Sequence, residues 1–131
     1  MKYIYTATFT PNEDSTKYYA RIPDLPGCIT TGASLQDAID QITDAASGWL
    51  VVAEDEGLEI ALPTAQSNVP TEDGMLLSLI SIDTIAYRAK TDTRAVRKNV
   101  SLPAWMVAMA DTRGINCSQI LQEGLLARLN A

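Results

Sequence analysis

Few residues in this chain have the types and spacing that catalysis requires. The sequence contains no histidine, which excludes Ser-His-Asp and Cys-His catalysis, histidine general bases and histidine-containing metal sites. Its two cysteines, Cys28 and Cys117, lie far apart in unlike contexts, so neither a CxxC motif nor a disulfide framework is present. This cysteine usage predicts a reduced, cytoplasmic setting.

Carboxylates are the remaining candidate catalytic groups, and they would act as ligands of a metal ion. Glu13, Asp14, Asp24, Asp73 and Asp83 would suit a metal-dependent nuclease if they converged on one hard cation. Asp83, however, follows an apolar run at a position where a helix cap is the simpler explanation. We therefore predict no catalytic residue, no metal and no cofactor, and we keep a metal-dependent nuclease as the least favoured alternative.

A different chemistry, recognition of DNA bases, is available to residues 96–102. Their side chains alternate between two faces, as in a β-strand. The apolar face carries Val96, Lys98, Val100 and Leu102, and the polar face carries Arg97, Asn99 and Ser101. Arginine can donate two hydrogen bonds to guanine, and asparagine can pair with adenine through two. A one-residue shift would exchange the faces and turn Lys98 outward; we favour the register that sends Val100 and Leu102 to the core.

The charge distribution divides the chain in two. Overall, 131 residues carry 10 Lys+Arg and 16 Asp+Glu, a net charge of −6 with a pI of about 4.4, which argues against general nucleic-acid binding. Residues 1–87 hold 3 Lys+Arg and 13 Asp+Glu, a net of −10, whereas residues 88–131 hold 7 and 3, a net of +4. This asymmetry predicts two functions on one chain.

The acidic segment predicts a small α+β layer. Composition predicts four strands, over residues 3–9, 17–22, 29–31 and 75–82. The first two are expected to form an antiparallel hairpin. A helix begins at the N-cap Ser34, with Asp37 in the capping-box position, and ends at Gly57. Because this helix joins the third and fourth strands as a crossover, those strands are expected to lie parallel. The order is β-β-β-α-β, with a short helical turn over 84–90.

Two features of the acidic segment could bind a partner. The polar side of the predicted helix carries Asp37, Asp40, Gln41, Asp44 and Ser47. Its aspartates are either a solvated face or a surface that steers a basic partner, because complementary charge accelerates association. The segment 24–28 (DLPGC) is either a binding loop or a rigid connector, and Leu25 belongs to the core in the second case.

The basic segment predicts a linker, a strand and two helices. Residues 88–95 are polar without an apolar period and predict the linker. After the strand at 96–102, Pro103 opens one helix, Gly114 ends it, and Asn116 caps another. About 36 residues cannot bury a sufficient core, so we expect two copies to pair their strands into an antiparallel ribbon over four helices. Such a ribbon fits the DNA major groove, and the start of the second helix offers backbone N–H groups to a phosphate.

Strings in both segments resemble one known family. VSLPAW and GINCSQILQEGL, with their spacing, resemble the ribbon-helix-helix domain of HicB-type antitoxins. YYARIPDLPGCITTGASLQDAI followed by LISID resembles the partial RNase H-like domain of the same family. The resemblance spans nearly the whole chain. It implies an antitoxin that neutralises a small, basic, RNA-cleaving HicA-type toxin and represses its own operon, with an RNase H-like domain that is not an active nuclease.

These inferences assign three regions to the chain: a HicB-like toxin-neutralising domain (1–87), a linker (88–95), and a ribbon-helix-helix domain for DNA binding and dimerisation (96–131). The residues assigned to DNA binding are Arg94, Arg97, Lys98, Asn99, Ser101, Asn116 and Ser118. The residues assigned to toxin binding are Asp24, Leu25, Asp37, Asp40 and Asp44.

The expected assembly is a homodimer through the C-terminal domain. A second contact through the N-terminal sheet, which would give a tetramer, stays open. No stretch approaches the roughly 20 apolar residues of a membrane span, so no membrane association is expected. The alternative function is a stand-alone ribbon-helix-helix repressor whose N-terminal domain senses a small ligand.

Overall fold

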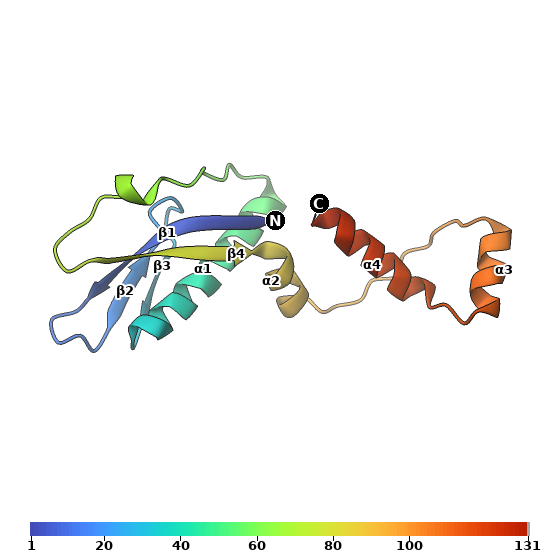
Figure 1. The fold of residues 1–131 in the computed structure, drawn as a ribbon, viewed down its shortest axis with the longest axis horizontal. Helices are drawn as coiled ribbons and strands as arrows, with labels where there is room; N and C mark the ends of the chain where they lie inside the picture. Colours follow the sequence, from blue (N-terminus) through green and yellow to red (C-terminus); the bar gives the residue numbers. More distant parts are fainter. Residues whose placement is uncertain (131) are drawn as a thin grey trace. The chain divides into compact units, whose positions relative to one another are not determined.

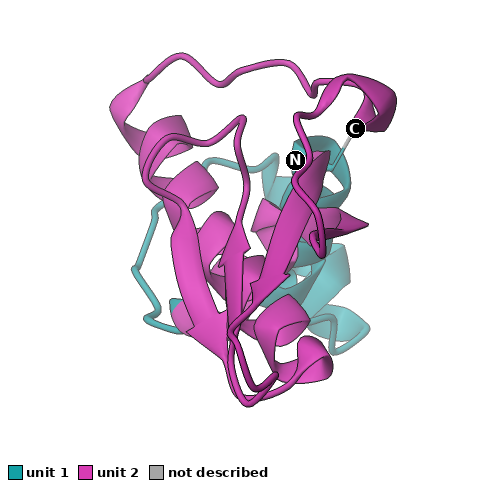
Figure 2. Ribbon diagram, turned by 90° about the vertical axis from the view of Figure 1, so that its left-hand side faces the viewer, with its two compact units in different colours: residues 1, 92–131 teal, residues 2–91 magenta. Residues whose placement is uncertain are grey.

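The structure, a computed structural model, describes residues 1–130. Its elements are β1 (Lys2–Pro11), β2 (Tyr18–Arg21), β3 (Ile29–Gly32), α1 (Leu35–Glu56), the short 3₁₀ helix η1 (Gln66–Asn68), β4 (Leu76–Asp83), α2 (Thr84–Thr91), α3 (Ala104–Thr112) and α4 (Cys117–Leu129) (Figure 1). The predicted α+β class is confirmed. The chain divides into two compact units (Figure 2), residues 2–91 and residue 1 with residues 92–131. We call residues 2–91 the N-terminal unit and residues 92–130 the C-terminal unit.

The sheet of the N-terminal unit is antiparallel throughout, with the strand order β3-β2-β1-β4. The predicted β1–β2 hairpin is confirmed. The prediction that the third and fourth strands lie parallel is wrong, because β3 and β4 form opposite edges and run in opposite directions. The long apolar strand β4 pairs with β1 from Lys2↔Asp83 to Phe9↔Leu76, whereas β3 has only four residues to offer.

Helix α1 covers one face of this sheet (Figure 1) and is capped as predicted. The Ser34 hydroxyl accepts a hydrogen bond from the amide of Asp37 at 3.0 Å. The Asp37 carboxylate reaches back to the amide of Ala33 at 2.9 Å, one residue before the usual capping-box donor. Gly57, with φ of +66°, ends the helix in the left-handed conformation that glycine favours.

The core lies between α1 and the sheet. Its largest fully buried apolar side chains are Tyr5, Phe9, Ile22, Leu25, Ile42, Leu50 and Ile82. Ser47, which the sequence places on the polar side of the helix, is also buried, so that prediction is wrong. Its hydroxyl donates to the carbonyl of Thr43 at 2.7 Å, and this bond removes most of the cost of burying a polar group.

Helix α2 shortens the predicted linker. Residues 88–91, predicted to be linker, form the last part of this helix. The helix begins after Asp83, whose carboxylate accepts a hydrogen bond from the amide of Ala86 at 3.1 Å. The guanidinium of Arg88, in α2, also forms ion pairs with α1. It lies 3.1 Å from the Glu54 carboxylate and 2.8 Å from the Asp55 carboxylate. The irregular segment therefore begins at Asp92.

The C-terminal unit contains two helices and no strand among its described residues. Residues 96–102, predicted as a strand, form none in a single chain, because a strand needs a partner to satisfy its backbone groups. Pro103 lies at the N-cap of α3 and not at its first helical position. The turn after α3 is as predicted: Gly114 has φ of +65°, and the amide of Ile115 bonds to the carbonyl of Ala110 at 3.0 Å. Among residues 1–130, no helix has the length and apolar character to cross a membrane.

Gly32 gives a direct test of the contact between β3 and α1. A Cβ atom at this position would meet the backbone nitrogen and Cα of Ala38, so Gly32→Ala should destabilise the N-terminal unit by about 1–3 kcal/mol. Gly48→Ala is the matched control, because its Cβ would lie 3.5 Å from the Tyr87 hydroxyl, an ordinary contact. It should leave stability unchanged or raise it by up to about 1 kcal/mol.

The readout is urea unfolding followed by Trp49 fluorescence in a Trp105→Phe background, which leaves one of the two tryptophans. Equal stability of the two glycine variants would contradict the close approach of β3 to α1.

Candidate functional site

The predicted DNA-reading segment keeps its alternation in the structure. Lys98, Val100 and Leu102 line a groove in the C-terminal unit. The intervening residues Arg97, Asn99 and Ser101 are exposed and do not line it. Residues 98–102 therefore alternate between groove-lining and exposed side chains, whereas Val96, predicted on the same face as Val100 and Leu102, is exposed and does not line the groove. The register of a strand here stays a prediction.

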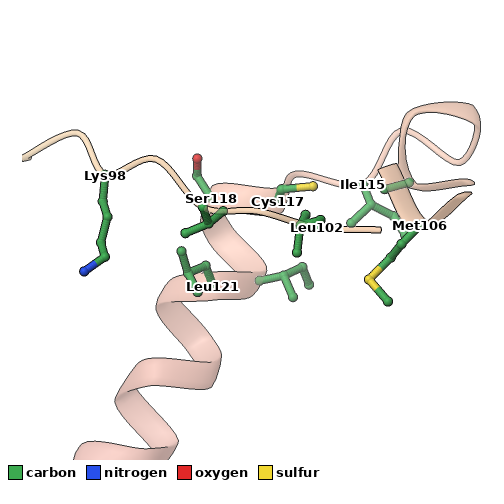
Figure 3. Close-up of a pocket in the computed structure, with 10 residues that line it drawn as sticks. Lys98, Leu102, Met106, Ile115, Cys117, Ser118 and Leu121 are labelled. Carbon is green, nitrogen blue, oxygen red and sulfur yellow. The ribbon is translucent and has the colours of Figure 1, made fainter. Parts of the chain in front are cut away.

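The groove is apolar and open, with a volume of about 370 Å³. The groove-lining residues are Lys98, Val100, Leu102, Met106, Ala110, Ile115, Cys117, Ser118, Ile120 and Leu121. Figure 3 shows Leu102, Ile115, Met106 and Leu121 around it, with Lys98 at one end. Within residues 92–130 no side chain is buried; even Met106 and Leu121 are 40% and 41% exposed.

The start of α4, where the sequence predicts a phosphate contact, is capped by a side chain. Asn116 is the N-cap, and its side-chain oxygen accepts from the amide of Gln119 at 3.1 Å. The amides of Cys117 and Ser118 belong to the first helical turn, where no acceptor exists within the helix. The Asn116 side chain is thus occupied by capping, and the Ser118 side chain lines the groove, so a phosphate would be held by backbone amides.

Arg94 differs from the other predicted DNA-binding residues, because its guanidinium is paired. It lies 3.0 and 3.1 Å from the two carboxylate oxygens of Asp92. The hydrogen bond and charge of Arg94 hold the pKa of Asp92 below its usual range. Both side chains are largely exposed, and an exposed ion pair of this kind is weak enough to exchange for a phosphate.

The five residues predicted to bind a basic partner are not brought together into one surface. Leu25 is 1% exposed, so its assignment as a contact residue is wrong; it packs in the core. Asp24 accepts from the amide and hydroxyl of Thr64 at 2.8 and 2.6 Å and so ties two loops together. Asp37 is used in the helix cap, which leaves Asp40 and Asp44 exposed on α1.

A polar network at the end of α1 escaped the sequence-based predictions. Glu54 accepts hydrogen bonds from Tyr3 at 2.8 Å, Thr84 at 3.0 Å and Arg88 at 3.1 Å. Burial acts to raise the pKa of Glu54, but the hydrogen bonds outweigh it and the pKa lies below its usual value. Burial, followed by the bond to Glu54, raises the pKa of Tyr3 to about 12. A carboxylate with its acceptors filled is a poor general base, so this network fastens α2 and β1 to α1. Its partners are too distant in sequence to leave a local signal.

The remaining groups to consider are potential metal ligands and the two cysteines. Among residues 1–130, no three His, Cys, Asp or Glu residues are placed to hold a metal ion. Cys28 is buried, and burial raises the pKa of its thiol to about 11, which keeps it protonated and unreactive at neutral pH. Cys117 is exposed.

Comparison with known proteins places this geometry among relatives. A family model described as HicB-like antitoxin of bacterial toxin-antitoxin system matches residues 5–130. Among solved structures, a toxin-antitoxin complex from Streptococcus pneumoniae is similar, with TM-score 0.60 and 20% identity over 98% of this chain and 99% of that chain. The antitoxin HicB of Burkholderia pseudomallei gives TM-score 0.54 and 23% identity over 97% and 98%. A structure of antitoxin HicB3 gives 0.51 and 24% over 96% of both chains. Among curated proteins, none matches this sequence.

The Glu54 network predicts a pH dependence of stability. Because the pKa of Glu54 is lowered on folding, its contribution is complete above the ordinary value of 4.5 and is lost as the pH falls through the folded-state pKa. Glu54→Gln should therefore destabilise the N-terminal unit at pH 7 by about 1–3 kcal/mol, with a smaller effect near pH 3. The measurement is urea unfolding at both pH values, with Glu56→Gln, at an exposed neighbour, as control. A Glu54→Gln effect that is the same at both pH values would contradict this role.

Proposed function

The chain belongs to the HicB-like antitoxin family of bacterial toxin–antitoxin systems, and from this premise we propose that it combines two activities. The N-terminal unit neutralises a small, basic, RNA-cleaving toxin of the HicA type by covering its active surface. The C-terminal unit dimerises and represses the operon that encodes the pair. Both activities are stoichiometric binding and not catalysis.

The observation that carries the repressor half is the uncovered groove of the C-terminal unit. Residues 92–130 hold an open apolar groove and not one buried side chain, and an isolated copy leaves this surface in water. A second copy placed on it would pair residues 96–102 of both chains and supply the partner that a strand requires. The result is a ribbon-helix-helix dimer, with Lys98 at the rim and its ammonium in water.

In this dimer the side chains that face away from the groove become the reading surface. Arg97, Asn99 and Ser101 from both copies stand side by side on the ribbon, which enters the major groove of a pseudo-palindromic operator. Arg97 and Asn99 supply the base contacts, and Ser101 is a weaker reader. The first-turn amides of α4 and the guanidinium of Arg94 contact phosphates.

The net charge of the N-terminal unit supports its proposed binding to a basic toxin. Residues 2–91 carry 5 Lys+Arg and 13 Asp+Glu, a net of −8, which attracts a basic protein and repels nucleic acid. One of the similar structures is a toxin-antitoxin complex, which agrees with a toxin as the partner of this chain. A tetramer formed through a second contact of the N-terminal sheets would let two ribbons occupy two half-sites, and it stays a prediction.

Arg97→Ala should weaken operator binding by about 10- to 100-fold, because a bidentate arginine–guanine pair contributes about 1–3 kcal/mol. Toxin binding should be unchanged. Arg128→Ala, an arginine of the same unit in the last turn of α4, is the control and should keep specific DNA binding. The measurement is fluorescence anisotropy with operator and scrambled duplexes, and calorimetry with the toxin. Loss of both activities in Arg97→Ala would contradict a chain with two separate binding units.

A chain that ends after Thr91 keeps all of α2, including the ion pairs of Arg88 with α1. It should be folded, bind toxin with unchanged affinity and have no measurable affinity for operator DNA. It should also have lost the self-association that the C-terminal unit provides, which analytical ultracentrifugation measures against the full chain. Failure of this folded fragment to bind toxin would place the neutralising surface outside the N-terminal unit.

A further inference from the structure

The N-terminal unit has a hollow of its own, which the assignments above do not use. It has a volume of about 400 Å³ and lies where the loop before β3, β3 itself and the second half of α1 meet. Its lining residues are Gly27, Cys28, Ile29, Ala45, Gly48, Trp49, Val52, Ala53 and Leu58. The indole of Trp49 donates a hydrogen bond to the carbonyl of Pro26 at 2.9 Å, which fixes the ring as one wall.

The hollow is bordered by apolar side chains that water reaches. Ile29 from β3 is 61% exposed, Val52 from α1 is 51% exposed, and Leu58 after the end of α1 is 53% exposed. β3 is also an edge strand that pairs only with β2 among the described residues, so its outer backbone groups are available to a partner. A contiguous apolar surface beside a strand edge is typical of a protein-binding site.

The charge around the hollow selects the partner. Helix α1 carries six carboxylates, at positions 37, 40, 44, 54, 55 and 56, and no lysine or arginine. Asp44 lies four residues before Gly48, and Glu56 lies four residues after Val52, so each flanks the hollow one helical turn away. A second copy docked here face to face would oppose the same carboxylates to each other, and this repulsion disfavours self-association. The fitting occupant is a basic protein that inserts an apolar side chain.

We propose that this hollow, the Trp49–Val52 hollow, is the docking surface for the basic toxin; this inference rests on the proposed function. The toxin places an apolar side chain between Ile29, Val52 and Leu58, and its lysines and arginines meet Asp44 and Glu56. Of the residues assigned from the sequence, only Asp44 belongs to this surface. The apolar contact supplies most of the affinity, and the carboxylates supply speed and selectivity.

The test compares two arginine substitutions at exposed apolar positions of the full-length chain. Val52→Arg introduces a long cation into the hollow, and Leu79→Arg introduces the same charge on β4, where the leucine is 59% exposed and outside the hollow. The probe is the purified toxin encoded beside this chain, titrated by calorimetry. Val52→Arg should weaken binding by about tenfold or more, as loss of a central contact does, whereas Leu79→Arg should stay within about twofold of the unsubstituted chain.

The outcomes separate this inference from the proposed function. No binding by the unsubstituted chain would contradict the toxin-binding half of the proposed function. Tight binding by both the unsubstituted chain and Val52→Arg would contradict the proposed docking surface but not the proposed function. Loss of binding in Leu79→Arg only would place the docking surface on the face of the sheet opposite α1.

Two further measurements guard against misfolding as the cause. Far-ultraviolet circular dichroism should be the same for both arginine variants, since both positions are exposed. In a Trp105→Phe background, Trp49 is the one tryptophan left as a reporter. Toxin binding should change the fluorescence of Trp49 in the chain that carries no substitution in the hollow. Unchanged Trp49 emission at saturating toxin, measured with a toxin variant that lacks tryptophan, would contradict docking at this surface.

Discussion

The C-terminal unit carries an apolar surface that one copy cannot bury, and both the dimer and the DNA-binding role proposed for this unit depend on that constraint. None of residues 92–130 is buried, and the groove lined by α3, α4 and residues 98–102 is open to water. In the proposed dimer, covering the groove and pairing the strand are the same event, because Lys98, Val100 and Leu102 form one side of the groove and Arg97, Asn99 and Ser101 alternate with them in the sequence. Under the proposed function, dimer formation, strand formation and creation of the DNA-reading surface are therefore coupled, so that each contributes to the free energy of the others.

The N-terminal unit buries its core within a single copy. Its core closes between α1 and the sheet, the helix is capped at both ends, and Glu54 fastens β1 and α2 to it. Helix α1 thereby has two roles: one face closes the core, and the other face carries the carboxylates and one wall of the Trp49–Val52 hollow. The proposed toxin-binding surface therefore belongs to a unit that closes its core within one copy, whereas the proposed DNA-binding surface requires a second copy.

Features set by short-range interactions were predictable from the sequence, and features set by distant contacts were not. The caps at Ser34 and Asn116 were predictable because the donor amide lies three residues away, and Gly57 and Gly114 end helices through their own backbone conformation. The edge of the sheet at which β4 pairs was not predictable, because a crossover helix does not specify with which free strand edge the next strand pairs. The choice between a core position and a binding position for Leu25 depends on distant groups, as does the pairing of Arg88 with Glu54, 34 residues apart. The Trp49–Val52 hollow needs three elements together.

The most direct test of the coupling is amide hydrogen exchange on the full-length chain at concentrations below and above its self-association constant. The account predicts that amides of residues 96–102, α3 and α4 exchange freely at low concentration and become protected together as copies associate, while β1 stays protected throughout. Protection of residues 96–102 in a chain shown to be monomeric, or their free exchange in a chain shown to be dimeric, would contradict it.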